Sequence, residues 1–157
     1  MKLSLKKGLS FGLTSGVITT LGMIVGIDAS TNSQLAVIAG IAAIAVADSF
    51  SDAFGIHVSE ESEDKHSKKE IWESTLATLI SKFLIASSFI IPLLLFDLNS
   101  AVLINIVWGM LLIVVFNFFM ARDLKEKPYK IILEHLGIAI VVVVITYLVG
   151  NWIGTLL

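Results

Sequence analysis

Five long apolar stretches dominate this sequence of 157 residues and restrict what it can fold into. Each is close to the roughly 20 residues that a helix needs to cross a hydrocarbon core of about 30 Å. A backbone inside lipid must satisfy its own hydrogen bonds, so the stretches are predicted to be helices. We therefore expect an all-α polytopic membrane protein, with residues 1–157 forming a single transmembrane domain. The stretches run approximately over residues 10–27, 35–57, 74–96, 100–120 and 133–155.

Composition excludes several other classes of protein. Charged residues make up only 15% of the chain and hydrophobic residues 56%, whereas an ordinary soluble domain is about 25% charged. The net charge of −2 provides no basic face for nucleic acid. The absence of cysteine excludes disulfides, thiolate metal sites and a cysteine nucleophile. No Gly-x-Ser-x-Gly, His-Glu-x-x-His or glycine-rich phosphate motif occurs, so we do not expect an enzyme.

The distribution of basic residues predicts the orientation. Ten of the 11 lysines and arginines lie before the first stretch, between the second and third, or between the fourth and fifth. The positive-inside rule makes these three segments cytoplasmic, with the N-terminus inside and the C-terminus outside. The other two connections, Asp28–Gln34 and Asp97–Asn99, contain no lysine or arginine and are predicted to be tight turns. The ten residues are Lys2, Lys6, Lys7, Lys65, Lys68, Lys69, Arg122, Lys125, Lys127 and Lys130.

The N-terminus has a competing interpretation as a cleaved signal peptide. Its basic start fits that interpretation, but glycines interrupt the first apolar stretch and no small-residue cleavage site follows. The sequence also shows no targeting extension. We therefore expect an integral protein of a prokaryotic cytoplasmic membrane rather than of an organelle.

Two aspartates in the second predicted helix are candidates for function. Asp48 and Asp52 are four residues apart and share one helix face. Charged groups inside a membrane are costly and usually functional, and two carboxylates this close need a cation or a proton between them. Carboxylates suit hard ions such as Mn²⁺, Fe²⁺, Mg²⁺ and Ca²⁺. Alternatively, Lys82 in the third stretch lies at similar depth and forms an ion pair with them, or extends to the interface.

Polar residues elsewhere have two interpretations each. Thr14, Ser15 and Thr19 accompany a series of glycines in the first stretch, a pattern typical of helix packing or of a polar path. The segment from His57 to Glu70 is expected to be a solvated charged loop. If the second helix continues through it, one face gathers acidic groups that attract divalent cations. That face contains His57, Glu60, Glu61 and Asp64.

Single polar residues of the last two stretches have simpler interpretations. The asparagines there are expected to form hydrogen bonds between helices. Glu134 and His135 are expected to be solvated at the cytoplasmic interface. The asparagines are Asn105, Asn117 and Asn151.

Two blocks of sequence resemble the vacuolar iron transporter family. Phe11-Gly-Leu-Thr-Ser-Gly-Val-Ile-Thr-Thr-Leu-Gly-Met-Ile-Val-Gly26 is similar to the family's first helix. Ile44-Ala-Val-Ala-Asp-Ser-Phe-Ser-Asp-Ala-Phe-Gly-Ile-His-Val-Ser-Glu-Glu-Ser-Glu63 is similar to its second helix and the acidic cytoplasmic extension that follows. Later segments match in type and spacing, namely Leu76-Ala-Thr-Leu79, Ile91-Pro-Leu-Leu94 and Ile145-Thr-Tyr-Leu-Val-Gly150.

The resemblance implies a function. It implies five transmembrane helices in a homodimer whose first helices lie near the axis. It also implies export of Fe²⁺ or Mn²⁺ from the cytoplasm by proton antiport, with no permanently bound cofactor. On this basis we expect the ion path to be lined by Thr14, Ser15 and Thr19. The expected metal-binding residues are Asp48, Asp52, Glu60, Glu63 and Asp64.

The chain departs from the family pattern at the expected site. The family usually has aspartate at the position of Ser15 and methionine at that of Asp52, and many members have glutamate at that of Ile44. Asp48 matches an acidic position found in a subset of members. The large cytoplasmic metal-binding helices have no room between Glu63 and Trp72, so the chain resembles a short form. An all-oxygen site favours Mn²⁺ over Fe²⁺.

The lysine inside the third stretch leads to an alternative function. We expect the family to have an apolar residue at the position of Lys82. Its ammonium group would then occupy the cation's place. The alternative is therefore a structural or regulatory membrane subunit that transports nothing and is held together by an Asp–Lys pair.

Overall fold

The computed structural model describes residues 2–63, 65–124 and 127–156, and within them it is all-helical. Two consecutive helices, α3 and α4, together form one span, Lys68–Leu95, so five segments are long and apolar enough to cross a membrane. The predicted fold class, an all-α membrane protein with five spanning helices, is confirmed. The helices are α1 (Leu3–Thr31), α2 (Gln34–Ser62), α3 (Lys68–Ser88), α4 (Ile90–Leu95), α5 (Leu98–Leu124) and α6 (Pro128–Gly154).

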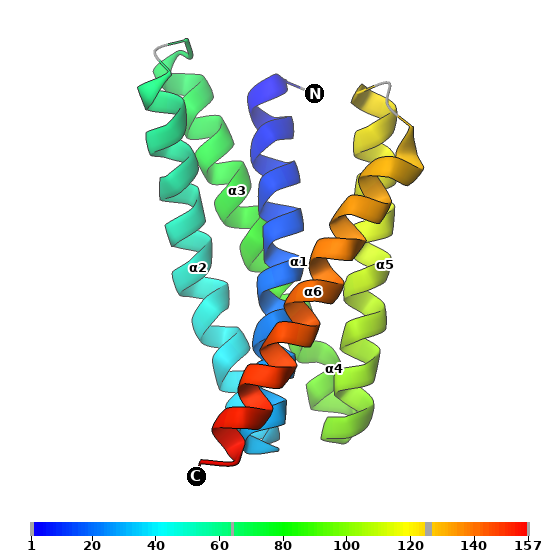
Figure 1. The fold of residues 1–157 in the computed structure, drawn as a ribbon. Coiled ribbons are helices and arrows are strands. Elements are labelled where there is room, and N and C mark those ends of the chain that lie inside the picture. Colours follow the sequence, from blue (N-terminus) through cyan, green and yellow to red (C-terminus); the bar gives the residue numbers. More distant parts are fainter. Residues whose placement is uncertain (1, 64, 125–126, 157) are drawn as a thin grey trace.

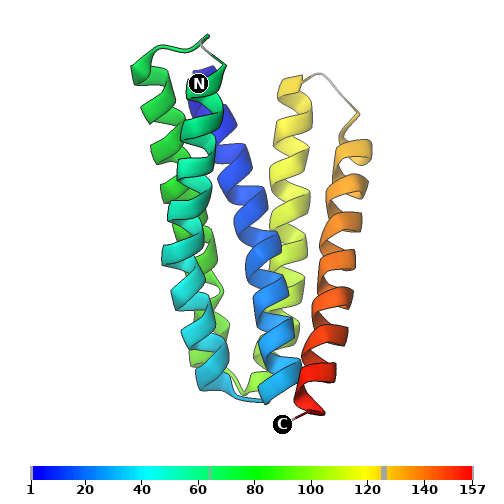
Figure 2. The ribbon, with the colours of Figure 1, turned by 60° about the vertical axis from the view of Figure 1, so that its left-hand side comes forward.

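Helix α1 is the centre of the bundle. The α2–α3 pair packs on one side of it and the α5–α6 pair on the other (Figure 1). The N-terminus, the α2–α3 connection and the α5–α6 connection lie together at one end, and the C-terminus lies at the opposite end (Figures 1 and 2). We call the first of these the basic end, because the three lysine- and arginine-rich segments meet there. That this end faces the cytoplasm stays a prediction.

Glycines allow α1 to approach its neighbours closely. A Cβ added to Gly12 would lie 2.6 Å from the carbonyl oxygen of Thr78 in α3. Near the other end of α1, a Cβ added to Gly150 of α6 would clash with the carbonyl oxygen of Gly26. Small residues at these crossings let the helix backbones touch, which is how helices associate where lipid removes the hydrophobic driving force. The first of the two interpretations of the glycine pattern, helix packing, is therefore confirmed.

The third span is broken at Phe89. Pro92 has no N–H to donate to the carbonyl of Ser88, four residues earlier, so the helical hydrogen-bond pattern is interrupted. At the same break, Asn105 of α5 bonds to the interrupted span, because its Nδ2 donates to the carbonyl oxygen of Phe89 at 3.1 Å. The expected role of Asn105 as a hydrogen-bond partner between helices is confirmed.

Two connections differ from the sequence predictions. The predicted turn Asp28–Gln34 is mostly helical, and only Asn32 and Ser33 join α1 to α2. Asn32 ends α1 in the left-handed conformation, with φ of 45°, and the Ser33 side chain accepts a hydrogen bond from the N–H of Ala36. These two caps fix the ends that apolar patterning alone could not place.

The expected charged loop after His57 is also wrong in its first part. Helix α2 continues to Ser62, and α3 begins at Lys68, before the predicted position 74. Ser67 and Glu70 form a capping box at the start of α3, with each side chain bonded to the other residue's backbone N–H. Polar helical turns therefore extend both apolar spans beyond the predicted membrane boundary.

Candidate functional site

Three helices bring four polar side chains together inside the bundle. The Lys82 ammonium of α3 lies 2.6 Å from Oδ2 of Asp48 in α2 and also contacts Oδ2 of Asp52. Ser15 of α1 donates a hydrogen bond to Oδ2 of Asp52 at 2.6 Å and accepts one from the Lys82 ammonium at 2.9 Å. We call these four residues the Lys82 cluster.

The aspartates meet at one cation position. Four residues make just over one turn of helix, so Asp48 and Asp52 both face α3. Two carboxylates this close repel each other in a low dielectric unless a cation lies between them. The Lys82 ammonium supplies that cation, and the cluster keeps a formal charge of −1. Of the interpretations left open for Lys82, the ion pair with both aspartates is the one observed.

Burial is uneven across the cluster. The Lys82 side chain is 1% exposed, whereas the side chains of Asp48 and Asp52 are 30% and 21% exposed. The Lys82 side chain is thus almost completely shielded from solvent. Burying its charge is favourable only because the two carboxylates pair with it. The two carboxylates keep part of their surface exposed, whereas the ammonium does not.

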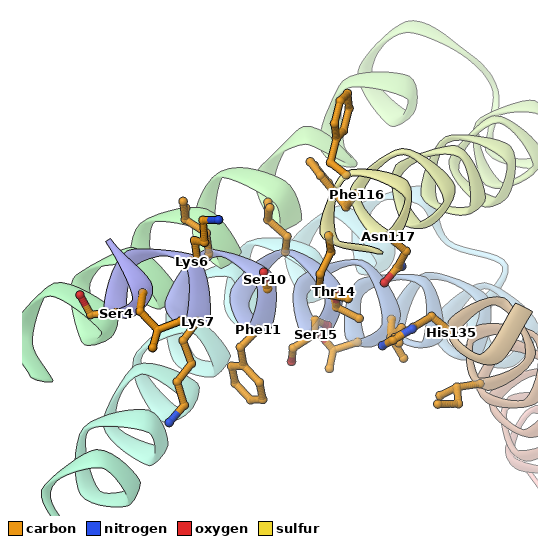
Figure 3. A pocket seen from close by; sticks show the side chains of 18 of the residues that line it. Ser4, Lys6, Lys7, Ser10, Phe11, Thr14, Ser15, Phe116, Asn117 and His135 are labelled. Carbon is orange, nitrogen blue, oxygen red and sulfur yellow. Dashed lines mark hydrogen bonds between the residues drawn. The ribbon is translucent and has the colours of Figure 1, made fainter. Parts of the chain in front are cut away.

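A cavity of about 930 Å³ lies beside the cluster on the other face of α1. Its walls come mainly from the half of α1 nearest the basic end and from the facing halves of α5 and α6 (Figure 3), and Glu60 of α2 and His66 complete the lining. Thr14, Ser15 and Thr19 all line it. Ser15 therefore lines the cavity and also donates to Asp52, so it connects the cavity with the Lys82 cluster. Thr19 is tied to the same turn, because its hydroxyl donates to the Ser15 carbonyl at 2.9 Å.

A second acidic pair lies closer to the basic end. Glu60 is 1% exposed, and its Oε1 lies 2.7 Å from the Lys7 ammonium of α1. Glu63 lies 3.9 Å from the same ammonium. Glu60 follows Asp52 by eight residues, or about 12 Å of helix, so the two acidic pairs are separate. Asp64, the last of the expected metal ligands, lies outside the described residues.

Both acidic pairs are thus partnered by lysine. Within the described part of the chain, no group of three or more histidine, cysteine, aspartate or glutamate side chains is arranged to hold a metal ion. The assignment of Asp48, Asp52, Glu60 and Glu63 as metal ligands therefore stays a prediction.

Two residues of the cavity wall were not expected there. Asn117 was expected to bond to another helix, but its Nδ2 donates to the carbonyl of Ile113 in its own helix at 2.8 Å. His135 was expected to be solvated, yet it is half-buried and lines the cavity. Neither position has a sequence signal, because the segments that line the cavity are distant along the chain.

Comparison with models of protein families gives a match over part of the chain. Residues 8–73 match the family described as the VIT family. The match covers nearly all of α1, all of α2 and the start of α3, so it includes Ser15, Asp48 and Asp52 but ends before Lys82. Searches of curated proteins and of solved structures found no match.

Proposed function

We propose that this membrane protein, whose residues 8–73 match the VIT family, moves a divalent metal ion across the bilayer and that Asp48 and Asp52 hold the ion on its way. VIT family transporters are not enzymes, and the family transports iron and manganese. One observation carries the proposal. Two carboxylates inside a membrane span converge, with the Ser15 hydroxyl, on a single cation position. An all-oxygen site of this kind suits Mn²⁺ or Fe²⁺.

The direction follows from orientation and the cavity. The positive-inside rule predicts that the basic end faces the cytoplasm, and the cavity lies in the half of the bundle at that end. The ion would enter the cavity from the cytoplasm, pass the Ser15 hydroxyl and reach Asp48 and Asp52. Protons arriving from the outside would neutralise the carboxylates and release the ion there, which makes the process proton antiport. We propose that two copies of the chain work together as a homodimer.

Lys82 must leave the carboxylates when the ion binds. Asp48 and Asp52 balance the charge of one divalent ion, whereas the ion and the ammonium together would leave an excess positive charge in a low dielectric. The long, flexible lysine stem lets the ammonium move away while its methylene groups stay packed. Lys82 thus competes with the ion for the two carboxylates and occupies the site whenever no ion is bound.

A second candidate function rests on the same lysine. Its complete burial and its contacts with both aspartates are also what a permanent structural ion pair would show. The chain would then be a membrane subunit with a structural or regulatory role that transports nothing. In that case the carboxylates would stabilise the fold and bind no metal.

The deciding experiment is metal flux into proteoliposomes. Purified protein is reconstituted, and Mn²⁺ and Fe²⁺ uptake is followed with and without a pH gradient. We expect saturable uptake that is lost when Asp48→Asn and Asp52→Asn are combined. Asp97→Asn is the matched control, because Asp97 lies in the connection before α5 and accepts a hydrogen bond from the N–H of Ser100.

Two outcomes would overturn the transport proposal. One is uptake that is unchanged in the Asp48→Asn, Asp52→Asn variant. The other is no uptake by folded wild-type protein. The second result, together with restored stability when Asp52→Asn is combined with Lys82→Met, would establish the structural subunit.

A further inference from the structure

Two side chains face the cavity from the side opposite the Lys82 cluster. Asn117 extends from α5 and His135 from α6 toward Thr14 of α1 (Figure 3). All three line the same cavity. None of them takes part in the contacts of the Lys82 cluster.

Asn117 presents an unpartnered oxygen. Its side chain is 1% exposed, and its Nδ2 donates to the Ile113 carbonyl at 2.8 Å. A carbonyl only accepts hydrogen bonds, so this contact identifies which end of the amide is the nitrogen. The remaining atom, Oδ1, is buried and has no hydrogen-bond partner. A buried acceptor of this kind needs a donor or a cation.

His135 presents a second acceptor. Its Nδ1 lies 2.9 Å from the carbonyl oxygen of Ile131 in the same helix. Because the carbonyl can only accept, Nδ1 is the nitrogen that donates, which leaves Nε2 to act as an acceptor or a metal ligand. A ring nitrogen in this state is the usual histidine ligand of a metal ion.

We propose that Asn117 Oδ1 and His135 Nε2, together with the Thr14 hydroxyl, form a second binding position for a divalent metal ion. One imidazole nitrogen with neutral oxygens suits an ion of intermediate hardness such as Fe²⁺ or Co²⁺. Neutral ligands bind such an ion weakly, which suits a station that must release it again. Its role as the station before Asp48 and Asp52 rests on the proposed function, whereas the binding itself does not.

The test measures Co²⁺ binding to the full chain in lipid nanodiscs by equilibrium dialysis. The background variant combines Asp48→Asn with Asp52→Asn, so that the Lys82 cluster contributes no carboxylate. We expect Co²⁺ binding to remain in this background, and His135→Gln to weaken it at least tenfold. His57→Gln is the control, because His57 bonds to Thr75 and contacts Trp72, both in α3, and does not line the cavity.

A second variant provides a gain of function. Asn117→Asp replaces the unpartnered amide with a carboxylate, so Co²⁺ should bind at least tenfold more tightly. If the background variant binds no Co²⁺, or if its binding is insensitive to His135→Gln, the position holds only water and the proposal is overturned. A chain that binds Co²⁺ through His135 but moves no metal supports this position and overturns the proposed transport.

Discussion

The Lys82 ammonium lies 2.6 Å from a carboxylate oxygen of Asp48, and this contact joins α3 to α2 inside the membrane span. The same ammonium contacts Asp52, to which Ser15 donates from α1. One cation therefore holds three helices together. It also occupies the position where two carboxylates would hold a metal ion.

Removing this cation should destabilise the fold. Lys82→Met leaves two carboxylates facing each other without a partner, and breaking a buried ion pair from one side costs about 3–5 kcal/mol. Adding Asp48→Asn and Asp52→Asn removes both charges and should restore most of the stability. Denaturant unfolding in detergent micelles checks this. Lys130→Met, at an exposed position of α6, should change stability by less than about 0.5 kcal/mol. A Lys82→Met variant as stable as Lys130→Met would contradict the ion pair.

The hydroxyl of Ser15 should have a measurable effect on stability. Ser15→Ala removes a hydrogen bond to a charged carboxylate, and such bonds contribute about 1.5–3 kcal/mol. Ser51→Ala, at an exposed position of α2, is the matched control and should be close to neutral. Unfolding measurements that give the same value for both substitutions would show that the bond to Asp52 does not form.

Close packing of α1 against α6 should tolerate no added methyl group. Gly150→Ala would push a Cβ into the carbonyl oxygen of Gly26, and overpacking of this kind costs about 1–3 kcal/mol. Gly137 is in the same helix, and a Cβ added there meets nothing within 4 Å. Gly137→Ala should therefore be neutral or slightly stabilising, because alanine has the higher helix propensity. Thermal unfolding of the two variants compares them directly. Equal losses would contradict the observed crossing.

The pair at the basic end should also contribute to stability. Lys7→Met would leave the Glu60 carboxylate, which is 1% exposed, without the ammonium that lies 2.7 Å away. An unsatisfied buried acceptor costs about 1–3 kcal/mol, and Glu60→Gln in the same chain should recover part of this loss. Lys68→Met, at an exposed position, provides the control in the same unfolding assay. No difference between Lys7→Met and Lys68→Met would show that the pair is irrelevant.

Apolar length and charge asymmetry predict most of this fold. Five spans and the gathering of Lys2, Lys68 and Arg122 at one end follow from patterns that lipid imposes on any sequence. Helix ends were predicted less well, because caps such as Asn32 and the capping box at Ser67 act through local geometry outside the apolar pattern.

The candidate site was only partly predictable. The spacing of Asp48 and Asp52 and the depth of Lys82 predicted that these three residues lie close together. The sequence alone could not show whether the carboxylates pair with Lys82 or bind a metal ion. Asn117 and His135 have no such pattern, because their proximity is apparent only from the cavity that segments distant along the chain form together. Asn151, which was expected to form a hydrogen bond between helices like Asn105 and Asn117, is exposed near the end of α6.

The central claim is that Lys82 and a metal ion compete for the same two carboxylates. Mn²⁺ binding to wild-type protein and to Lys82→Met in nanodiscs tests it most directly, with bound Mn²⁺ measured by electron paramagnetic resonance. The account predicts at least tenfold tighter binding in Lys82→Met, and loss of this gain when Asp52→Asn is added. Equal or weaker binding in folded Lys82→Met protein would contradict it, and Lys82 would then be a structural partner of Asp48 and Asp52 alone.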